Sequence, residues 1–356
     1  MTTEQSTDGG PGALQADLVL EGGGVKGIAL VGAISVLEEH GYRFNRVAGT
    51  SAGSIVGALV AAGMDAAELQ DVMRELDYSR FQDARGISRL GVPGKAASLV
   101  FRKGIYEGDY LTSWLGGQLG EKGVASFGDL PRADSRSTGE LDDTDYRLVV
   151  MASDVTSGCI RRLPWDLREV WGADPAEFPV VDAVRASMSI PFFYRPASFR
   201  WKDRSTTWMV DGGMLSNFPV ATFDRPAGSG PPRWPTFGIK LSARPRQALT
   251  NEVTGTITLA KAMLATMTGW YDQQYVAEAS VQARTIFVDT FGITATRFDL
   301  TAEDANRLFE SGRTAAAAFL DTWDFEKYKD TFRSDAEDAG AADEAGAPTT
   351  DPSATA

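Results

Sequence analysis

The sequence predicts an α/β fold in which a mostly parallel sheet is covered by helices on both faces. Two observations favour this fold. Short apolar runs alternate with longer helical patterns along the chain, which is typical of parallel sheets. Two of the predicted helices also begin at glycine-rich turns that directly follow a strand. The chain has 356 residues, with 43% hydrophobic and 23% charged residues, so it is long enough to bury a large core.

The first predicted unit spans residues 18–64 and contains both glycine-rich turns. In order, it consists of the apolar strand 18–20, the turn 22–27, a helix ended by Gly41, the strand 46–49, the G-x-S-x-G turn 49–53 and an apolar helix over 55–62. Neighbouring parallel strands end at the same edge of a sheet, so we expect the two turns to lie side by side at that edge.

The rest of the chain continues the alternation within one predicted domain over residues 17–325. The further predicted elements are a helix capped by Asp65 and Glu68, a helix around 110–115, strands at 146–152, 208–210, 236–241 and 285–288, helices at 180–188 and 255–282, and a helix capped by Thr301 and Asp304 that ends near Leu320. Residues 1–16 are polar and are expected to be mobile, and the biased composition of 334–356 predicts disorder.

Charge and composition narrow the function classes. The net charge of −13 argues against nucleic acid as the main partner. The single cysteine, Cys159, excludes an intramolecular disulfide and a cysteine metal cluster, and we expect it to be a small buried or inert side chain. The N-terminus does not resemble a secretory signal, and the longest apolar stretch, 54–64, is too short to span a bilayer. The expected location is therefore the cytoplasm, with peripheral membrane contact as an option.

Residues 79–104 combine six basic residues and one acid with several apolar side chains. They are either a solvated surface connection or a lid that meets anionic lipid headgroups. Residues 131–145 are expected to form a polar loop.

Three kinds of anion site contain a glycine-rich turn such as 22–27: a dinucleotide site, a P-loop and an oxyanion hole. Gly22, Gly24 and Gly27 satisfy G-x-G-x-x-G, but a dinucleotide site needs an acid at the end of the second strand, and none is present there. A P-loop is excluded because Lys26 precedes Gly27. Backbone N–H groups at a helix start also suit an oxyanion.

Ser51 lies in the second turn, between a strand and a helix, where a nucleophile elbow would place it. A serine hydroxyl needs a base, and the chain has one histidine, His40. His40 ends the helix that starts near Val25, so it lies roughly 20 Å from the turn. We therefore expect a carboxylate or lysine as the base. Asp211 is the first candidate for the base, because it follows a strand and precedes two glycines. Asp154 also follows a strand and is the alternative candidate, unless its side chain only caps the turn that follows it.

Taken together, these residues resemble the patatin-like phospholipase family. The chain contains the family's G-G-G-x-[RK]-G loop at 22–27, its G-x-S-x-G serine at 49–53 and its D-G-[GA] aspartate at 211–213, in that order. Further matches are 104–106, Asp154-x-Thr156-x-Gly158 and 186–191. The resemblance runs from about residue 16 to 241, and with fewer matches to about 320.

The resemblance implies a three-layer α/β/α fold and a Ser-Asp dyad, with no cofactor and no metal. It implies that Ser51 is the nucleophile and Asp211 the proton acceptor. The implied oxyanion loop is Gly22, Gly23, Gly24, Val25, Lys26 and Gly27, with the amides of Gly23, Gly24 and Val25 as donors, and the implied motif glycines are Gly49, Gly53, Gly212 and Gly213.

The activity that follows is phospholipase A-type hydrolysis of fatty acyl esters in lipid catabolism, with a phospholipid or another acyl-ester lipid as substrate. Two alternatives stay open. One is an esterase or thioesterase for small soluble substrates, and the other is a lipid-binding protein without turnover.

Overall fold

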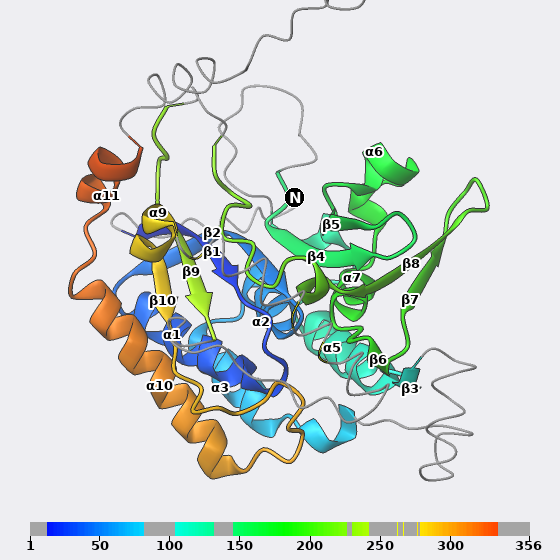
Figure 1. Ribbon diagram of the computed structural model, residues 1–356, viewed down its shortest axis with the longest axis horizontal. Coiled ribbons are helices and arrows are strands. Elements are labelled where there is room, and N and C mark those ends of the chain that lie inside the picture. The colour runs from blue at the N-terminus through cyan, green and yellow to red at the C-terminus, as the bar shows by residue number, and fades with distance from the viewer. Residues whose placement is uncertain are drawn as a thin grey trace, which may run out of the picture.

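The protein has a three-layer α/β/α architecture, described in a computed structural model over residues 13–81, 104–131, 145–225, 230–241, 262, 266, 276 and 278–333 (Figure 1). The central sheet has the strand order β10-β9-β1-β2-β4-β8-β7, with β5 paired to β4. Its strands are β1 Leu14–Leu20, β2 Tyr42–Thr50, β4 Leu148–Asp154, β5 Cys159–Leu163, β7 Ala197–Arg200, β8 Thr206–Asp211, β9 Thr236–Lys240 and β10 Thr285–Phe287. A small second sheet pairs β3 Gly104–Tyr106 with β6 Phe192–Tyr194.

The strands from β10 to β4 are parallel, which confirms the predicted mostly parallel sheet. The other pairings of this sheet, β4 with β5, β4 with β8 and β8 with β7, are antiparallel. The α-helices of the described chain are α1 Gly27–Glu39, α2 Ala52–Ala61, α3 Ala66–Glu75, α5 Asp109–Glu121, α6 Leu167–Trp171, α7 Val180–Ser187, α9 Ala279–Ala283, α10 Ala302–Leu320 and α11 Phe325–Phe332.

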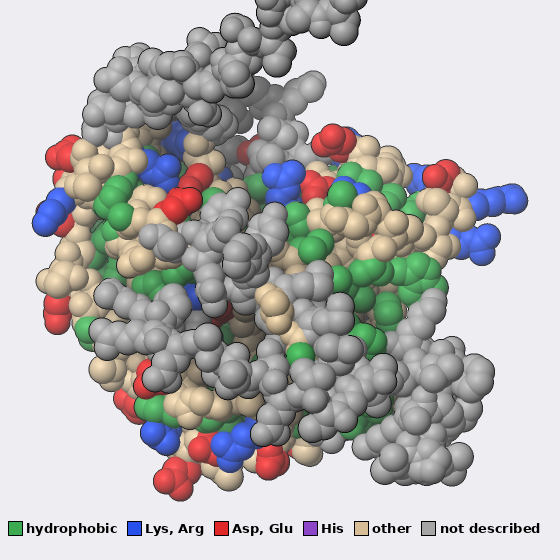
Figure 2. Space-filling model, in the orientation of Figure 1, with side chains coloured by type: hydrophobic (Ala, Val, Ile, Leu, Met, Phe, Trp, Pro, Cys, Tyr) green, Lys and Arg blue, Asp and Glu red, His purple; other side chains and the backbone are tan. Residues whose placement is uncertain are grey.

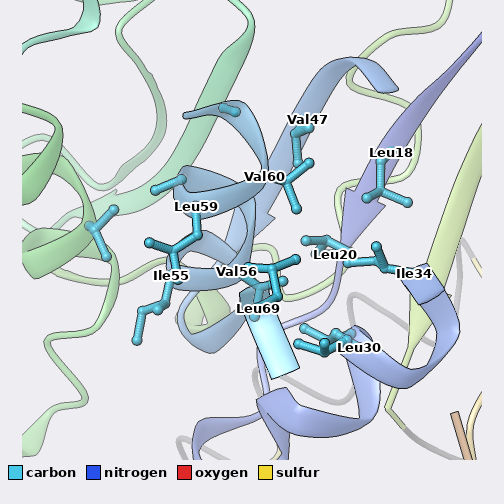
Figure 3. Packing of buried hydrophobic residues seen from close by; sticks show 14 of the residues in the cluster. Leu18, Leu20, Leu30, Ile34, Val47, Ile55, Val56, Leu59, Val60 and Leu69 are labelled. Atoms are coloured by element: carbon cyan, nitrogen blue, oxygen red, sulfur yellow. The ribbon is translucent and has the colours of Figure 1, made fainter. Parts of the chain in front are cut away.

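Side chains from the central strands enter two hydrophobic cores in alternation. Leu18 and Leu20 of β1 join the larger core, whereas Val19 between them joins the smaller one on the other face. Figure 3 shows Leu18, Leu20 and Val47 meeting residues of α1 and α2 in the larger core. A strand buried on both faces must be apolar throughout, which explains why the short runs of this sequence are continuous rather than alternating.

Several predicted helix ends are confirmed by their capping contacts. The side chain of Asp65 accepts from the backbone N–H of Glu68, and Glu68 returns a bond to Asp65. At the start of α10, the side chain of Thr301 accepts from the backbone N–H of Asp304. Gly41 follows the end of α1 with φ +86°, the left-handed conformation that terminates helices at glycine.

Some boundaries differ from the prediction. β1 begins at Leu14, so residues 14–16 belong to the sheet rather than to a mobile tail. α11 extends past residue 325, the predicted end of the domain. Most of the segments 79–104, 131–145 and 255–282 and all of 334–356 lie outside the described residues. Within the part that is described, no helix has the length and apolarity needed to cross a bilayer.

Candidate active site

Ser51 lies at the junction between β2 and α2, as the sequence predicts. Its backbone has φ 53° and ψ −125°, a sparsely populated conformation that costs about 1–3 kcal/mol and is often found at functional sites. The flanking glycine is required by contact, because a Cβ on Gly53 would lie 2.4 Å from the carbonyl oxygen of Leu20. The close approach of α2 to the end of β1 therefore requires glycine at this residue.

Two consecutive hydrogen bonds connect the backbone N–H of Ser51 through Ser187 to Met151. The Ser51 N–H donates to the Ser187 hydroxyl at 2.8 Å, and that hydroxyl donates to the carbonyl of Met151 at 2.6 Å. The strained turn is thus held from α7 and β4. This N–H has its partner already and is not available to a substrate.

The predicted nucleophile and the predicted base lie side by side. The Ser51 hydroxyl donates to Oδ2 of Asp211 at 2.7 Å, and the N–H of Gly213 donates to Oδ1 at 2.7 Å. Both side chains are buried. Burial raises the pKa of Asp211 from its ordinary 3.8 to about 6, against the smaller lowering effect of its hydrogen bonds with Ser51 and Gly213. A carboxylate with this pKa is ionised at neutral pH and is a stronger base than an exposed aspartate.

The N–H groups of the glycine-rich turn divide into two sets. The amides of Gly22, Val25 and Lys26 donate to the carbonyls of Asn217, Ala295 and Gly23, at 3.1, 3.1 and 3.2 Å. The amide of Gly27 donates to the carbonyl of Gly24.

No described residue accepts a hydrogen bond from Gly23 or Gly24. Val25, one of the three donors expected by resemblance, therefore does not offer a free N–H in this structure. Gly24 has φ +56°, and a Cβ there would lie 1.9 Å from the carbonyl oxygen of Ala295, so the turn also requires glycine at this residue.

A buried polar network lies beside this turn. The Glu21 carboxylate forms an ion pair with Lys240 and accepts from the N–H of Leu241. The side-chain amide of Asn217 donates to the carbonyl of Gly22 at 3.2 Å and to Glu21 at 3.3 Å. Asn217 therefore binds both the N–H and the C=O of Gly22. Lys26 donates to the carbonyl of Leu241 at 3.2 Å, and burial lowers the pKa of its ammonium group.

The other candidate residues lie elsewhere. His40 ends α1, at the opposite end from the glycine-rich turn, and its ring contacts the carbonyl of Val36. Asp154 braces its own turn by accepting from Thr156 and Ser157 and by pairing with Arg161. Cys159 is the first residue of β5 and is exposed. Of the two alternatives expected for it, a buried or an inert side chain, the structure contradicts the buried one.

Sequence reasoning gave no role to three residues that contact the site. Ser187 binds the backbone of Ser51, Asn217 binds the glycine-rich turn, and the sulfur of Met188 lies 3.4 Å from the Ser51 hydroxyl oxygen. The family match at 186–191 included two of them without showing what they contact. Asn217 had no signal beyond its position shortly after Asp211.

Sequence relatives match this chain over different shares of their own lengths. The uncharacterized protein YqhO of Bacillus subtilis (strain 168) is 36% identical over 309 residues, which cover 87% of this chain and 99% of that protein. The lysophospholipase NTE1 of Lodderomyces elongisporus is 28% identical over 213 residues, which cover 58% of this chain but 12% of that protein. The chain therefore corresponds to a small part of the yeast protein.

Two solved structures match this chain at low sequence identity. VipD from Legionella pneumophila matches with a TM-score of 0.48 and 18% identity, over 88% of this chain and 67% of that chain. ExoU from Pseudomonas aeruginosa matches with a TM-score of 0.45 and 18% identity, over 86% and 53%. A family model for patatin-like phospholipases matches residues 18–224. The chain belongs to the patatin-like phospholipase family.

Proposed function

We propose that this protein is a serine lipid acyl hydrolase of phospholipase A type, in which Ser51 is the nucleophile and Asp211 the general base. Family membership supports hydrolysis of lipid acyl esters. The observation that supports these two roles is the 2.7 Å hydrogen bond from the Ser51 hydroxyl to the buried Asp211 carboxylate. It has the geometry expected of a nucleophile and its base.

Acylation begins when the Ser51 oxygen attacks the ester carbonyl carbon while Asp211 takes the hydroxyl proton. The N–H groups of Gly23 and Gly24 are the proposed oxyanion donors, because no described residue accepts from them. They stabilise the negative charge on the tetrahedral intermediate. When the intermediate collapses, the ester C–O bond breaks and Asp211 returns its proton to the departing lysolipid oxygen.

Deacylation repeats these steps with water. Asp211 takes a proton from a water molecule, whose oxygen attacks the acyl carbon. The bond to Ser51 then breaks, Asp211 returns the proton to the serine oxygen, and the fatty acid leaves. The raised pKa of Asp211 suits both directions of proton transfer near neutral pH.

The proposal is tested by incubating the purified protein with mixed phospholipids and measuring released fatty acids and lysolipids by mass spectrometry. Ser51→Ala is the matched control, since it removes one oxygen from a turn held through its backbone. We expect both products from the wild type and neither from a folded Ser51→Ala variant. Turnover of short soluble esters alone would favour a small-molecule esterase. Failure of a fluorophosphonate to label Ser51 would favour a lipid-binding protein without turnover.

A further inference from the structure

The hairpin formed by β7 and β8 projects from the edge of the sheet at which Ser51 lies. Residues Ala152, Ser153 and Asp154 of β4 pair with Asp211, Val210 and Met209 of β8. β8 therefore runs from Asp211 outward past the end of β4. Thr206, its first residue, lies about 17 Å from Asp211 along the strand, at about 3.4 Å per residue. Figure 1 shows the hairpin standing clear of the rest of the sheet.

The tip of this hairpin is basic, and its cations have no ion-pair partner among the described residues. Arg200, Lys202 and Arg204 are all exposed, and no carboxylate of the described residues forms an ion pair with any of them. The acid between them, Asp203, accepts from the N–H and hydroxyl of Ser205. Figure 2 shows the resulting group of Lys and Arg side chains at the end of the hairpin. A basic tip on a chain of net charge −13 is a local feature rather than a property of the whole surface.

Aromatic packing holds the tip in place. Trp201 stacks on Trp171 of α6, with ring centroids 4.5 Å apart and planes 12° from parallel. Both indole N–H groups donate to the hydroxyl of Thr207, at 2.9 and 3.1 Å. Phe199 packs against the same ring of Trp201. The hairpin is therefore preorganised, and little conformational entropy is lost when its tip binds a partner.

Exposed apolar side chains lie on the two segments that contact the hairpin, the turn after β4 and α6. Val155 is 45% exposed, and its N–H donates to the carbonyl of Trp208 in β8. Val170 is 37% exposed and precedes Trp171 in α6. Cations beside tryptophan and exposed aliphatic groups match the interface of an anionic bilayer, which offers phosphate charge outside and acyl chains beneath. A nucleic acid backbone offers phosphate charge but no acyl chains for the exposed valines, so it matches this surface less well than a bilayer does.

We propose that the β7–β8 hairpin is a docking arm for anionic lipid bilayers, with Arg200, Lys202 and Arg204 as the headgroup contacts. This inference rests on the proposed function, because the docked arm would turn the sheet edge that holds Ser51 toward its lipid substrate. It differs from the lid predicted for residues 79–104, which would also contact anionic headgroups; most of those residues lie outside the described part of the chain.

The main experiment compares binding to phosphatidylcholine vesicles with and without phosphatidylserine. The test variant is R200Q/K202Q/R204Q. The matched control, R43Q/R74Q/K327Q, makes the same change in net charge at three exposed residues on β2, α3 and α11. All proteins also carry Ser51→Ala, so that vesicle binding is measured without turnover. We expect the test variant to lose roughly a hundredfold in affinity for the phosphatidylserine vesicles, because each basic side chain contributes roughly fivefold near an anionic surface. The control should lose much less.

Cys159 provides a second measurement that does not depend on these substitutions. It is the only cysteine of the chain, it is exposed, and its turn is tied to β8 by the hydrogen bond from Trp208 N–H to the Thr156 hydroxyl. An environment-sensitive fluorophore on Cys159 should shift to the blue on phosphatidylserine vesicles and be quenched by brominated lipid.

Equal loss in the test and control variants, or no fluorescence change on binding, would overturn the docking arm. So would a wild-type chain that ignores phosphatidylserine. These outcomes are separable from failure of the proposed function, which is judged with Ser51 intact on phospholipids dispersed in neutral detergent, where docking to an anionic bilayer plays no part. Absence of fatty acid release there, with normal vesicle binding, would refute the chemistry and leave the docking arm in place.

Discussion

Replacement of Asp211 by asparagine should stabilise the fold while abolishing turnover. Asparagine has the shape of the protonated carboxyl. Its oxygen can still accept from the Gly213 N–H, and its amide can donate to the Ser51 oxygen, so both hydrogen bonds of the wild type have a counterpart. What the substitution removes is a buried negative charge that no cation pairs with among the described residues.

The size of the effect follows from the pKa of Asp211. Burial raises that pKa from 3.8 to about 6, and the difference corresponds to about 3 kcal/mol between the two protonation states. A carboxyl with a raised folded pKa contributes most to stability when it is protonated. This contribution is complete below pH 3.8 and is lost as the pH rises through about 6. The asparagine side chain stays neutral at every pH, so the Asp211→Asn variant should gain up to about 3 kcal/mol over the wild type near neutral pH.

Urea denaturation of both proteins across this pH range measures the difference directly. We expect the variant to unfold at higher urea near neutral pH, and the two curves to converge in acid. A variant that is less stable than the wild type at neutral pH would refute the reasoning, because it would show that the Asp211 carboxylate is well solvated or paired. The expected combination of higher stability and lost activity is common at active sites.

Three further predictions concern the rate. The wild-type kcat/KM should rise with pH through about 6 and then level off, because Asp211 must be ionised to act as a base. A kcat/KM that does not change down to pH 4 would show that Asp211 is not the base. Asn217→Ala should lower kcat about tenfold or more with little change in KM, because it releases Gly22 and the oxyanion turn, and an unchanged kcat would show that the turn holds itself. The third comparison uses purified variants whose folding is checked by circular dichroism. His40→Ala should keep full activity, and Asp154→Asn should keep most of it. An inactive but folded His40→Ala variant would disprove the Ser51–Asp211 pairing.

The sequence was sufficient to predict the central part of the fold. β1, α1, β2 and α2 follow from apolar runs and from glycines at fixed positions, because buried parallel strands and helix ends leave strong local patterns. The antiparallel strands β5 and β7 were missed. Their side chains are partly exposed and mixed in character, and their pairing depends on partners far along the chain, which no local pattern reveals.

The candidate site was also predictable only in part. Ser51, Asp211 and the glycine-rich turn occur in short sequence motifs, so the residue types and their order in the chain were enough to select them as candidates. The roles of Ser187 and Asn217 depend on contacts between segments more than 130 residues apart, such as Ser51 to Ser187. The Val25 amide could not be judged either, because its acceptor, Ala295, belongs to a distant loop.

The turn from Asp211 to Asn217 has a consequence for how this protein could be controlled. Its first residue receives the Ser51 hydroxyl, the carbonyl of Ser216 accepts from the Thr50 hydroxyl, and Asn217 holds Gly22 through both backbone groups. Any partner or modification that displaces this turn would separate the base, the nucleophile strand and the oxyanion turn at once. A regulator acting on this one turn would therefore affect the proposed base, the proposed nucleophile and the proposed oxyanion donors together, rather than one of them alone.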